Sequence, residues 1–333
     1  MPVILGIESS CDETSAAVYA NGVMLSNIIA NQTIHEAYGG VVPELASRVH
    51  QQNIIPAVQQ AITNAKVSKN DIDAVAFTRG PGLLGSLLVG VSFAKAFALA
   101  KNIPLIEVNH MQAHILAHFI DEPKPSFPFL CLTVSGGHTQ IVLVKDYFDM
   151  EVIGHTQDDA AGEAMDKTSK ILGLPYPGGP LIDKYARLGN PDAYQFPEPQ
   201  IPGYNFSFSG LKTAILYFIQ RSEAQDPDFI KNNLPDICAS VEKRIVTILL
   251  KKLAKAALAY GIKDVALAGG VSANTGLRQG LAELGAKYQW NTFVPRMEYC
   301  TDNAAMIAVA GYYKYLQGDF TDQHVAPLAR MPF

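Results

Sequence analysis

Three of the chain's eight histidines recur at every fourth position of the segment 109–119, which reads NHMQAHILAHF. Helix residues four apart lie about 5–6 Å from each other on one face, so His110 and His114 could both bind one metal ion. His118 continues the row but lies too far along the helix to share that ion. Histidine pairs at this spacing also occur as packed or solvated pairs, and the segment alone leaves both interpretations open.

A metal site needs at least one more ligand, and the best distant candidate is Asp302. It precedes a segment of small residues that reads as a helix, so its carboxylate could lie at the helix start. Two histidines and one carboxylate with open coordination positions suit Fe(II) or Zn(II). The spacing resembles the HExxH motif of zinc proteases. Met111 replaces the glutamate that acts as general base there, which argues against a protease.

Composition indicates a globular, core-rich protein. The 333 residues exceed one ordinary domain and predict two, and 48% of them are hydrophobic. The formal net charge is −5, whereas proteins that bind nucleic acid over a broad surface are usually basic. Binding of nucleic acid would therefore need a local basic patch or a basic partner.

The cysteine usage and the lack of a recognisable targeting signal in this sequence favour the cytoplasm. The four cysteines are far apart and form no CxxC pair, which favours a reducing compartment and argues against a zinc ribbon. We find no apolar run that approaches the ~20 residues needed to span a bilayer. The chain begins MPVILGIESS, without the basic region of a signal peptide. We therefore expect a cytoplasmic protein without membrane association.

Apolar patterns predict a β-hairpin near the start, followed by alternating helices and strands. Two strands at 14–20 and 22–32 meet at Asn21-Gly22, a strong hairpin signal. The other elements expected in the first third are strands at 3–8, 72–80 and 104–110 and helices at 42–66, with a kink or break at Pro56, and at 83–102.

The opening plan recurs later in the chain. Residues 129–146 again read as strand, glycine-serine turn and strand, and residues 264–284 read as strand, glycine pair and helix. Such a weak internal repeat predicts two α/β lobes built on one plan. Two such lobes, with turns facing a shared cleft, are typical of the actin-like ATPase and sugar-kinase superfold.

Two glycine-rich turns could hold phosphate through free backbone N–H groups. They are TVSGGHT at 133–139 and AGGVSANTGLR at 268–278, where Asn274 could offer an amide to an adenosine. One such turn is often only a tight turn, but two in related positions favour nucleotide binding. The P-loop motif GxxxxGK[ST] does not occur in the sequence.

Two further segments carry carboxylates beside small residues. Asp166 lies among small residues expected to line a cleft, where a ribose hydroxyl is the usual partner of such a group. Glu163 and Lys167 are four apart and are also explained as a surface ion pair. Asp183 lies in the first turns of a helix that opens with the glycine turn YPGG.

At this point a family resemblance emerges from nine motifs. They occur in the order GIESSCDET, GGVVPELASR, GPGLLGSLLVG, NHMQAH, VSGGHTQ, AAGEAMDKTSKILGLPYPGGP, FSFSGLK, GGVSAN and CTDN. Together they resemble the universal tRNA threonylcarbamoyladenosine transferase family, formerly called O-sialoglycoprotein endopeptidase. The resemblance runs from about residue 4 to about residue 312. The chain departs from the commonest form of the metal motif at Gln112-Ala113, where Glu-Gly is frequent, and neither residue is a ligand.

The resemblance implies the actin-like fold: two duplicated ribonuclease-H-like lobes with a nucleotide and metal cleft between them. We expect lobes of 1–109 plus about 300–333, and of 110–299. It also implies transfer of a threonylcarbamoyl group from its adenylate to the exocyclic amine of the adenosine beside the anticodon, in tRNAs that read ANN codons. The implied cofactor is one divalent ion per subunit, Fe(II) or Zn(II), with the adenylate donor or ATP in the cleft.

By the motif match, each site residue takes an expected role. The metal ligands are His110, His114 and Asp302. The expected nucleotide-binding residues are Thr133, Val134, Ser135, Gly136, Gly137, Asp166, Gly179, Asp183 and Asn274. Asp12 and Glu13, in the CDET turn, are candidates for a catalytic or organising role.

The resemblance also implies partners: tRNA, an inactive paralogue of the same fold, and a P-loop ATPase. Since the chain is acidic, we expect tRNA to bind a composite surface with local basic residues, namely Arg48, Lys212, Arg221, Lys243 and Arg244. The small residues of 83–102 suit either a dimer face or packing against the chain's own sheet.

Two other functions compete with this one. An actin-like kinase or ATPase would use the same cleft without needing the two histidines and Asp302, but NHMQAH and FSFSGLK argue against it. A non-catalytic paralogue would not be expected to keep His110, His114 and Asp302, and all three are present.

Overall fold

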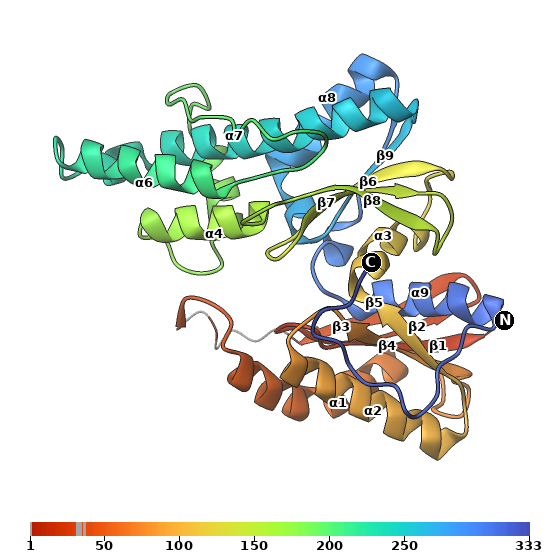
Figure 1. The fold of residues 1–333 in the computed structure, drawn as a ribbon. Coiled ribbons are helices and arrows are strands. Elements are labelled where there is room, and N and C mark those ends of the chain that lie inside the picture. Colours follow the sequence, from red (N-terminus) through yellow and green to blue (C-terminus); the bar gives the residue numbers. More distant parts are fainter. Residues whose placement is uncertain (1, 31–34, 36–37) are drawn as a thin grey trace. The chain divides into compact units, whose positions relative to one another are not determined.

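The computed structural model describes residues 2–30, 35 and 38–333, and the chain forms two compact units (Figure 1). Unit 1 is Met1–Lys124 with Pro295–Phe333, and unit 2 is Pro125–Val294. These bounds differ from the expected lobes, because α3 (His110–Leu116) and η2 (Ala117–Phe119) pack on α9 (Ala304–Gln317) and so belong to unit 1.

The sheet of unit 1 has the order β3-β2-β1-β4-β5. Its strands are β1 (Val3–Glu8), β2 (Thr14–Ala20), β3 (Val23–Ala30), β4 (Ala74–Gly80) and β5 (Leu105–Asn109). β1, β2 and β3 are antiparallel neighbours, whereas β4 runs parallel to β1 and β5 parallel to β4. Asn21 and Gly22 have φ of 57° and 80°, as a primed hairpin turn requires, which confirms the predicted hairpin. The expected end of its second strand, 31–32, lies outside the described residues.

Helices cover both faces of this sheet (Figure 1). α1 (Pro43–Ala65) contacts β2 and β3 on one face, and α2 (Leu84–Lys101) contacts β4 there. α9 contacts β1, β2 and β4 on the other face, and a short η4 (Met297–Tyr299) precedes it. α1 continues through Pro56, so the expected kink or break does not end the helix.

Some small residues of α2, such as Gly90, Ala94 and Ala98, are buried and serve internal packing, whereas others, such as Ser92 and Ala96, are exposed. A Cβ on Gly85 or Gly90 would lie 2.4 Å or 2.3 Å from the hydroxyl of Ser47 or Ser9, so the helix can approach these neighbours only because it has glycine there. Among the described residues, α2 is also the one helix long and apolar enough, by length and composition, to cross a membrane. Core helices of soluble proteins often have this character, and α2 packs against α1 and β4.

Unit 2 repeats the sheet of unit 1. Its order, β8-β7-β6-β9-β10, matches β3-β2-β1-β4-β5 strand for strand, with three antiparallel strands followed by two parallel ones. The strands are β6 (Phe129–Val134), β7 (Thr139–Val144), β8 (Met150–His155), β9 (Asp264–Ala268) and β10 (Asn291–Phe293). The predicted internal repeat is therefore confirmed at the level of topology.

The core of unit 2 joins β6 and β7 to the helices that follow them. Leu132 and Ile141 pack there with Ile215, Leu249 and other apolar residues. The helices are α4 (Ala161–Ile171), α5 (Gly178–Ala186), α6 (Ser209–Glu223), α7 (Phe229–Tyr260), η3 (Gly270–Ala273) and α8 (Thr275–Tyr288).

Candidate metal centre and nucleotide-binding turns

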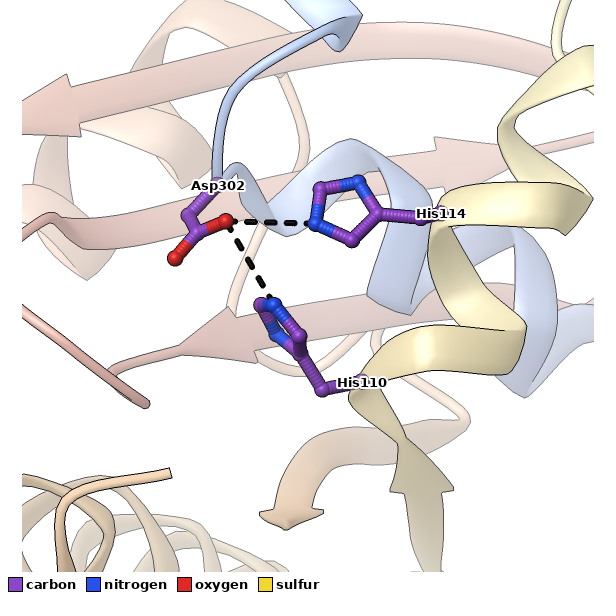
Figure 2. Close-up of side chains that lie close together, drawn as sticks. All are labelled: His110, His114 and Asp302. Atoms are coloured by element: carbon purple, nitrogen blue, oxygen red, sulfur yellow. Dashed lines mark hydrogen bonds and ion pairs between the residues drawn. The ribbon is translucent and has the colours of Figure 1, made fainter. Parts of the chain in front are cut away.

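Tertiary structure brings the three predicted metal ligands together in unit 1. Figure 2 shows the Asp302 carboxylate facing both imidazole rings. Asp302 Oδ1 lies 3.2 Å from His114 Nε2 and 3.4 Å from His110 Nε2. The ligating atoms of the three side chains all lie within 4.8 Å of one another.

Two capped helix starts position these side chains. The Asn109 side chain accepts hydrogen bonds from the backbone N–H groups of Met111 and Gln112, so α3 begins at His110. Asn303 caps α9 in the same way through Met306 N–H, and Asp302 is the residue before that cap. Because α3 packs on α9, the two helix starts hold their metal-ligating side chains side by side.

The donor set fits a divalent ion. Donors about 2.0–2.1 Å from a tetrahedral ion are about 3.3 Å apart, and the two distances from Asp302 Oδ1 match this separation. The Nε2 atom of His114 faces Asp302, and its buried Nδ1 has no hydrogen-bond partner among the residues that the structure describes. Nitrogen and carboxylate donors of this kind suit both Zn(II) and Fe(II).

The electrostatics of the cluster follow from burial and from the paired charges. Burial alone would raise the pKa of Asp302, but the two histidines hold it well below its usual range. Burial alone would lower the pKa of His110, yet Asp302 and Glu8 raise it well above its usual value. Burial dominates at His114 and lowers its pKa, which leaves that ring neutral and able to act as a ligand.

Glu8 is a site residue that the sequence analysis missed. It ends β1 and is fully buried, and its Oε2 lies 3.1 Å from His110 Nδ1. Thr78 Oγ1 donates to the same oxygen at 2.6 Å, and the backbone N–H of Ser10 donates to Oε1. Glu8 lies within the GIESSCDET motif, but its contact with His110 spans 102 sequence positions, so the motif did not indicate this role.

The catalytic candidates Asp12 and Glu13 lie in the loop after β1. Both side chains are partly buried. Burial, together with the carboxylates of Asp302 and Asp12, raises the pKa of Glu13 to about 9. Glu13 therefore lies within the electrostatic influence of the metal centre and is protonated at neutral pH in the absence of an ion.

In unit 2 the turn between β6 and β7 carries the residues that were expected to bind phosphate. Thr133 and Val134 are buried at the end of β6. Ser135 closes the turn, because its N–H donates to His138 O at 2.8 Å and its Oγ accepts from His138 N–H at 3.1 Å. At Gly136 and Gly137 a Cβ would meet no described atom within 4 Å, so the tip of the turn is open.

The next expected residues follow along α4 and α5. Asp166 Oδ1 accepts from the N–H groups of Gly178 and Gly179, at 2.9 Å and 3.0 Å, and thus holds the start of α5. Burial raises the pKa of Asp166. Lys167 pairs with Glu163 and Asp159, as the surface ion-pair interpretation predicts for the first of these.

The start of α8 completes this network. Asp183 accepts hydrogen bonds from the N–H and the hydroxyl of Thr275, both at 3.1 Å. Asn274 caps α8 through Leu277 N–H, and its Nδ2 donates to Glu242 Oε1 at 2.5 Å. The Asn274 amide is thus largely engaged within the protein, so one remaining N–H is what it can offer a ligand.

Glu242, on α7, is the second residue that sequence reasoning missed. Burial and the neighbouring Asp183 raise its pKa to about 7, against the hydrogen bond from Asn274. A Cβ at Gly276 would lie 2.9 Å from Glu242 Oε2, so this carboxyl lies directly under the α8 start. The sequence feature closest to a signal for Glu242 was the GGVSAN motif, whose Asn274 contacts it across 32 positions.

Comparison with known proteins decides the family. A family model described as tRNA N6-adenosine threonylcarbamoyltransferase matches residues 23–309. The chain belongs to this family. Proteins of that name from Christiangramia forsetii and Porphyromonas gingivalis are 63% and 60% identical to it. Each match covers 99% of this chain and 98% of the relative, which confirms the resemblance seen in the motifs.

Solved structures confirm the fold class of this threonylcarbamoyltransferase-family chain. HypF from T. kodakarensis matches with a TM-score of 0.63 at 16% identity, over 97% of this chain and 49% of that chain. ROK hexokinase from Thermus thermophilus matches with a TM-score of 0.51 at 18% identity, over 95% and 100%. At these identities the likeness shows the actin-like fold alone. Family membership makes the chain a transferase of a tRNA-modifying family.

The five basic residues expected to bind tRNA differ in their surroundings. Arg48 pairs with Glu44, Lys243 with Asp192 and Arg244 with Glu198. Arg221 is exposed on α6, where its Nε donates to Tyr217 O, and Lys212 lies about two and a half turns nearer the start of that helix. α6 therefore carries the basic side chains least engaged by the ion pairs described.

Proposed function

We propose that this member of the family transfers the threonylcarbamoyl group from threonylcarbamoyl-adenylate to the exocyclic amine of the adenosine beside the anticodon, in tRNAs that read ANN codons. The observation that carries the proposal is the convergence of His110, His114 and Asp302 in a chain of this family. The amine nitrogen bonds to the carbamoyl carbon, and the bond from that carbon to the phosphate oxygen breaks. AMP leaves with the bonding electrons, and the amine proton passes to solvent.

His110, His114 and Asp302 would hold one divalent ion per subunit, Fe(II) or Zn(II). When bound, such an ion supplies Lewis-acid polarisation of the donor. The chain's own contribution is to fix the ligands: capped helix starts at α3 and α9 position them, and both histidines are buried. Preorganised donors cost no rearrangement when charge develops during the reaction.

Unit 2 would bind the adenylate. The open tip at Gly136 and Gly137 offers backbone N–H groups to phosphate oxygens, and the oxygen of Asp166 that Gly178 and Gly179 leave free can accept from a ribose hydroxyl. Asp183 and Asn274 shape the neighbouring start of α8, with Thr133 and Val134 anchoring the turn. Since the donor is already activated, positioning the amine matters more than a strong base. Asp12 and Glu13 are the candidates for a catalytic or organising role in this step.

The partners we propose are tRNA, an inactive paralogue of the same fold and a P-loop ATPase, acting in the cytoplasm. Gly90 of α2 packs inward against Ser9, whereas Gly85, Ser92 and Ala96 are exposed, so small residues also lie on the outer face of this helix. Leu84, Leu88 and, on α1, Ile55 are exposed, and these apolar side chains are the better candidates for a protein partner. For tRNA, we expect binding to weaken as salt increases, and a flat response would exclude phosphate contacts.

The decisive experiment is a transfer assay with unmodified tRNA and synthetic adenylate, with and without the proposed partners. Asp302→Ala should lose bound metal and transfer together. Asp319→Ala, which removes an exposed carboxylate paired with Lys314, is the matched control and should retain both. Steady ATP turnover that is indifferent to Asp302, without transfer by the wild type, would favour the kinase alternative. Full transfer by a metal-free His110→Ala variant would exclude a role for the ion.

A further inference from the structure

Glu8 is a candidate for a specific function, because complete burial of a charged carboxylate lowers the stability of the folded protein unless the charge is compensated. Its side chain is 0% exposed, and an unpaired charge there would strongly destabilise the fold. The structure compensates with three hydrogen-bond donors from three segments: Ser10 N–H after β1, Thr78 Oγ1 on β4 and His110 Nδ1 on α3. Of these three, only His110 is a candidate metal ligand.

We propose that Glu8 is a positioning residue of the metal centre. It holds His110 in the tautomer that carries a proton on Nδ1, so that Nε2 is the atom that binds the ion. This inference rests on the metal site of the proposed function. It extends that site from three ligands to a second layer built by β1 and β4.

The contact geometry supports this orientation. A carboxylate can only accept hydrogen bonds, so the 3.1 Å contact between Glu8 Oε2 and His110 Nδ1 requires the proton on Nδ1. The other ring nitrogen, Nε2, is the atom 3.4 Å from Asp302 Oδ1. The ring is therefore held at both nitrogens, between a buried carboxylate and the ligand set.

The carboxylate itself is held in place. Thr78 Oγ1 donates to Oε2, the oxygen that faces His110, and Ser10 N–H donates to Oε1. The Ser10 hydroxyl lies 3.1 Å from His110 Nδ1 as well, so the ring nitrogen faces two oxygens. With both oxygens occupied by donors, the plane of the Glu8 carboxylate cannot turn away from the histidine.

The two histidines differ in this respect. His114 Nδ1 has no partner among the described residues, whereas His110 Nδ1 faces a buried carboxylate. A carboxylate behind a metal-bound histidine orients the ring and raises its basicity, and its removal typically costs 10–100-fold in metal affinity. The effect of Glu8 should therefore pass through His110 alone.

Metal affinity is the first test, with Co²⁺ as the probe and visible absorption as the readout. Glu8→Gln, which keeps the side-chain shape, should bind Co²⁺ about 10–100-fold more weakly than the wild type. Thr78→Val, which removes the donor that holds Glu8, should show a smaller loss. The matched control is Glu107→Gln, because Glu107 is bound by Arg79 rather than by a metal ligand; its affinity should stay within about twofold.

A second measurement needs no variant. In ¹⁵N-labelled wild type loaded with Zn²⁺, NMR should show His110 with a proton on Nδ1 and metal on Nε2. Metal on Nδ1 would overturn the proposal, and so would Co²⁺ affinity in folded Glu8→Gln equal to that of the wild type. Either result leaves the transfer reaction standing. Wild type that binds neither ion would overturn the proposal together with the metal site.

Discussion

Glu8 and Glu242 are both buried glutamates, with exposed fractions of 0% and 8%, yet their pKa values shift in opposite directions. Glu8 meets a histidine and two further donors, and its pKa is lowered although burial alone would raise it. Glu242 meets one amide and a second carboxyl, Asp183, and burial raises its pKa to about 7. The difference teaches that burial does not decide the charge of a carboxyl here. The chemistry of the groups that face it does.

The largest expected effect concerns the backbone that brings Glu8 and Asp302 to the same site. A Cβ on Gly6 of β1 would lie 2.6 Å from Ala304 O and 2.7 Å from Ala308 N, so α9 would have to move. Gly6→Ala should lower the free energy of unfolding by about 3 kcal/mol and weaken Zn²⁺ binding, as urea denaturation and Zn²⁺ titration would show.

Gly210→Ala is the control for this prediction. A Cβ at Gly210, in helix α6, would meet no described atom within 4 Å, so this variant should be as stable as the wild type or slightly more stable. Unchanged stability in Gly6→Ala would mean that β1 and α9 are less tightly joined than these distances imply.

The next effect tests the charged glutamate. Glu8→Gln presents an NH₂ group to donors that now face an oxygen, and it leaves the buried His110 with Asp302 as its remaining anionic partner. We expect the metal-free protein to lose about 2 kcal/mol of stability at pH 7, measured by urea denaturation. A Glu8→Gln variant as stable as the wild type would show that the charge of Glu8 does not stabilise the folded protein.

Glu242→Gln should stabilise the protein, whereas Glu8→Gln destabilises it. In the folded protein Glu242 keeps its proton up to about pH 7, whereas the unfolded chain releases it near 4.5. The folded state then binds more protons across this window, so the glutamate lowers stability progressively as pH rises through it. At about 1.4 kcal/mol per pKa unit, the penalty above pH 7 is at most about 3 kcal/mol.

The amide removes this penalty and can donate to Asp183. We therefore expect Glu242→Gln to be about 1–2 kcal/mol more stable than the wild type at pH 8, and nearly equal to it at pH 5, by urea denaturation at both values. A stability difference that is the same at both pH values would show that Glu242 does not titrate as proposed.

The smallest effect concerns Arg187, which lies 3.4 Å from Asp183 and is largely exposed. Its positive charge lowers the pKa of Glu242 slightly, so Arg187→Ala should raise that pKa, as ¹³C NMR titration of the Glu242 carboxyl would show. Because exposed pairs contribute little, stability at pH 8 should fall by no more than about 0.5 kcal/mol. A lower Glu242 pKa in this variant would contradict the assignment of its neighbours.

Much of the architecture could be predicted because its signals are local. Asn21-Gly22 predicted a turn that needs two positive φ angles, and the structure has them. The repeated strand-turn-strand pattern predicted two matching sheets, because each copy of the pattern lies within a short segment of the sequence. The helix at 42–66 was predicted with a kink or break at Pro56, but packing on β2 and β3 maintains it as one element.

The sequence by itself determined the family, the repeated α/β plan and the candidate ligands His110, His114 and Asp302, because motifs and periodicity are properties of short segments. Only the tertiary structure decided which groups surround those ligands. Glu8 reaches His110 across 102 positions, and Glu242 reaches Asn274 across 32. Hydrogen bonds and charge interactions depend on distance in space, and a folded chain brings together residues that no local pattern relates.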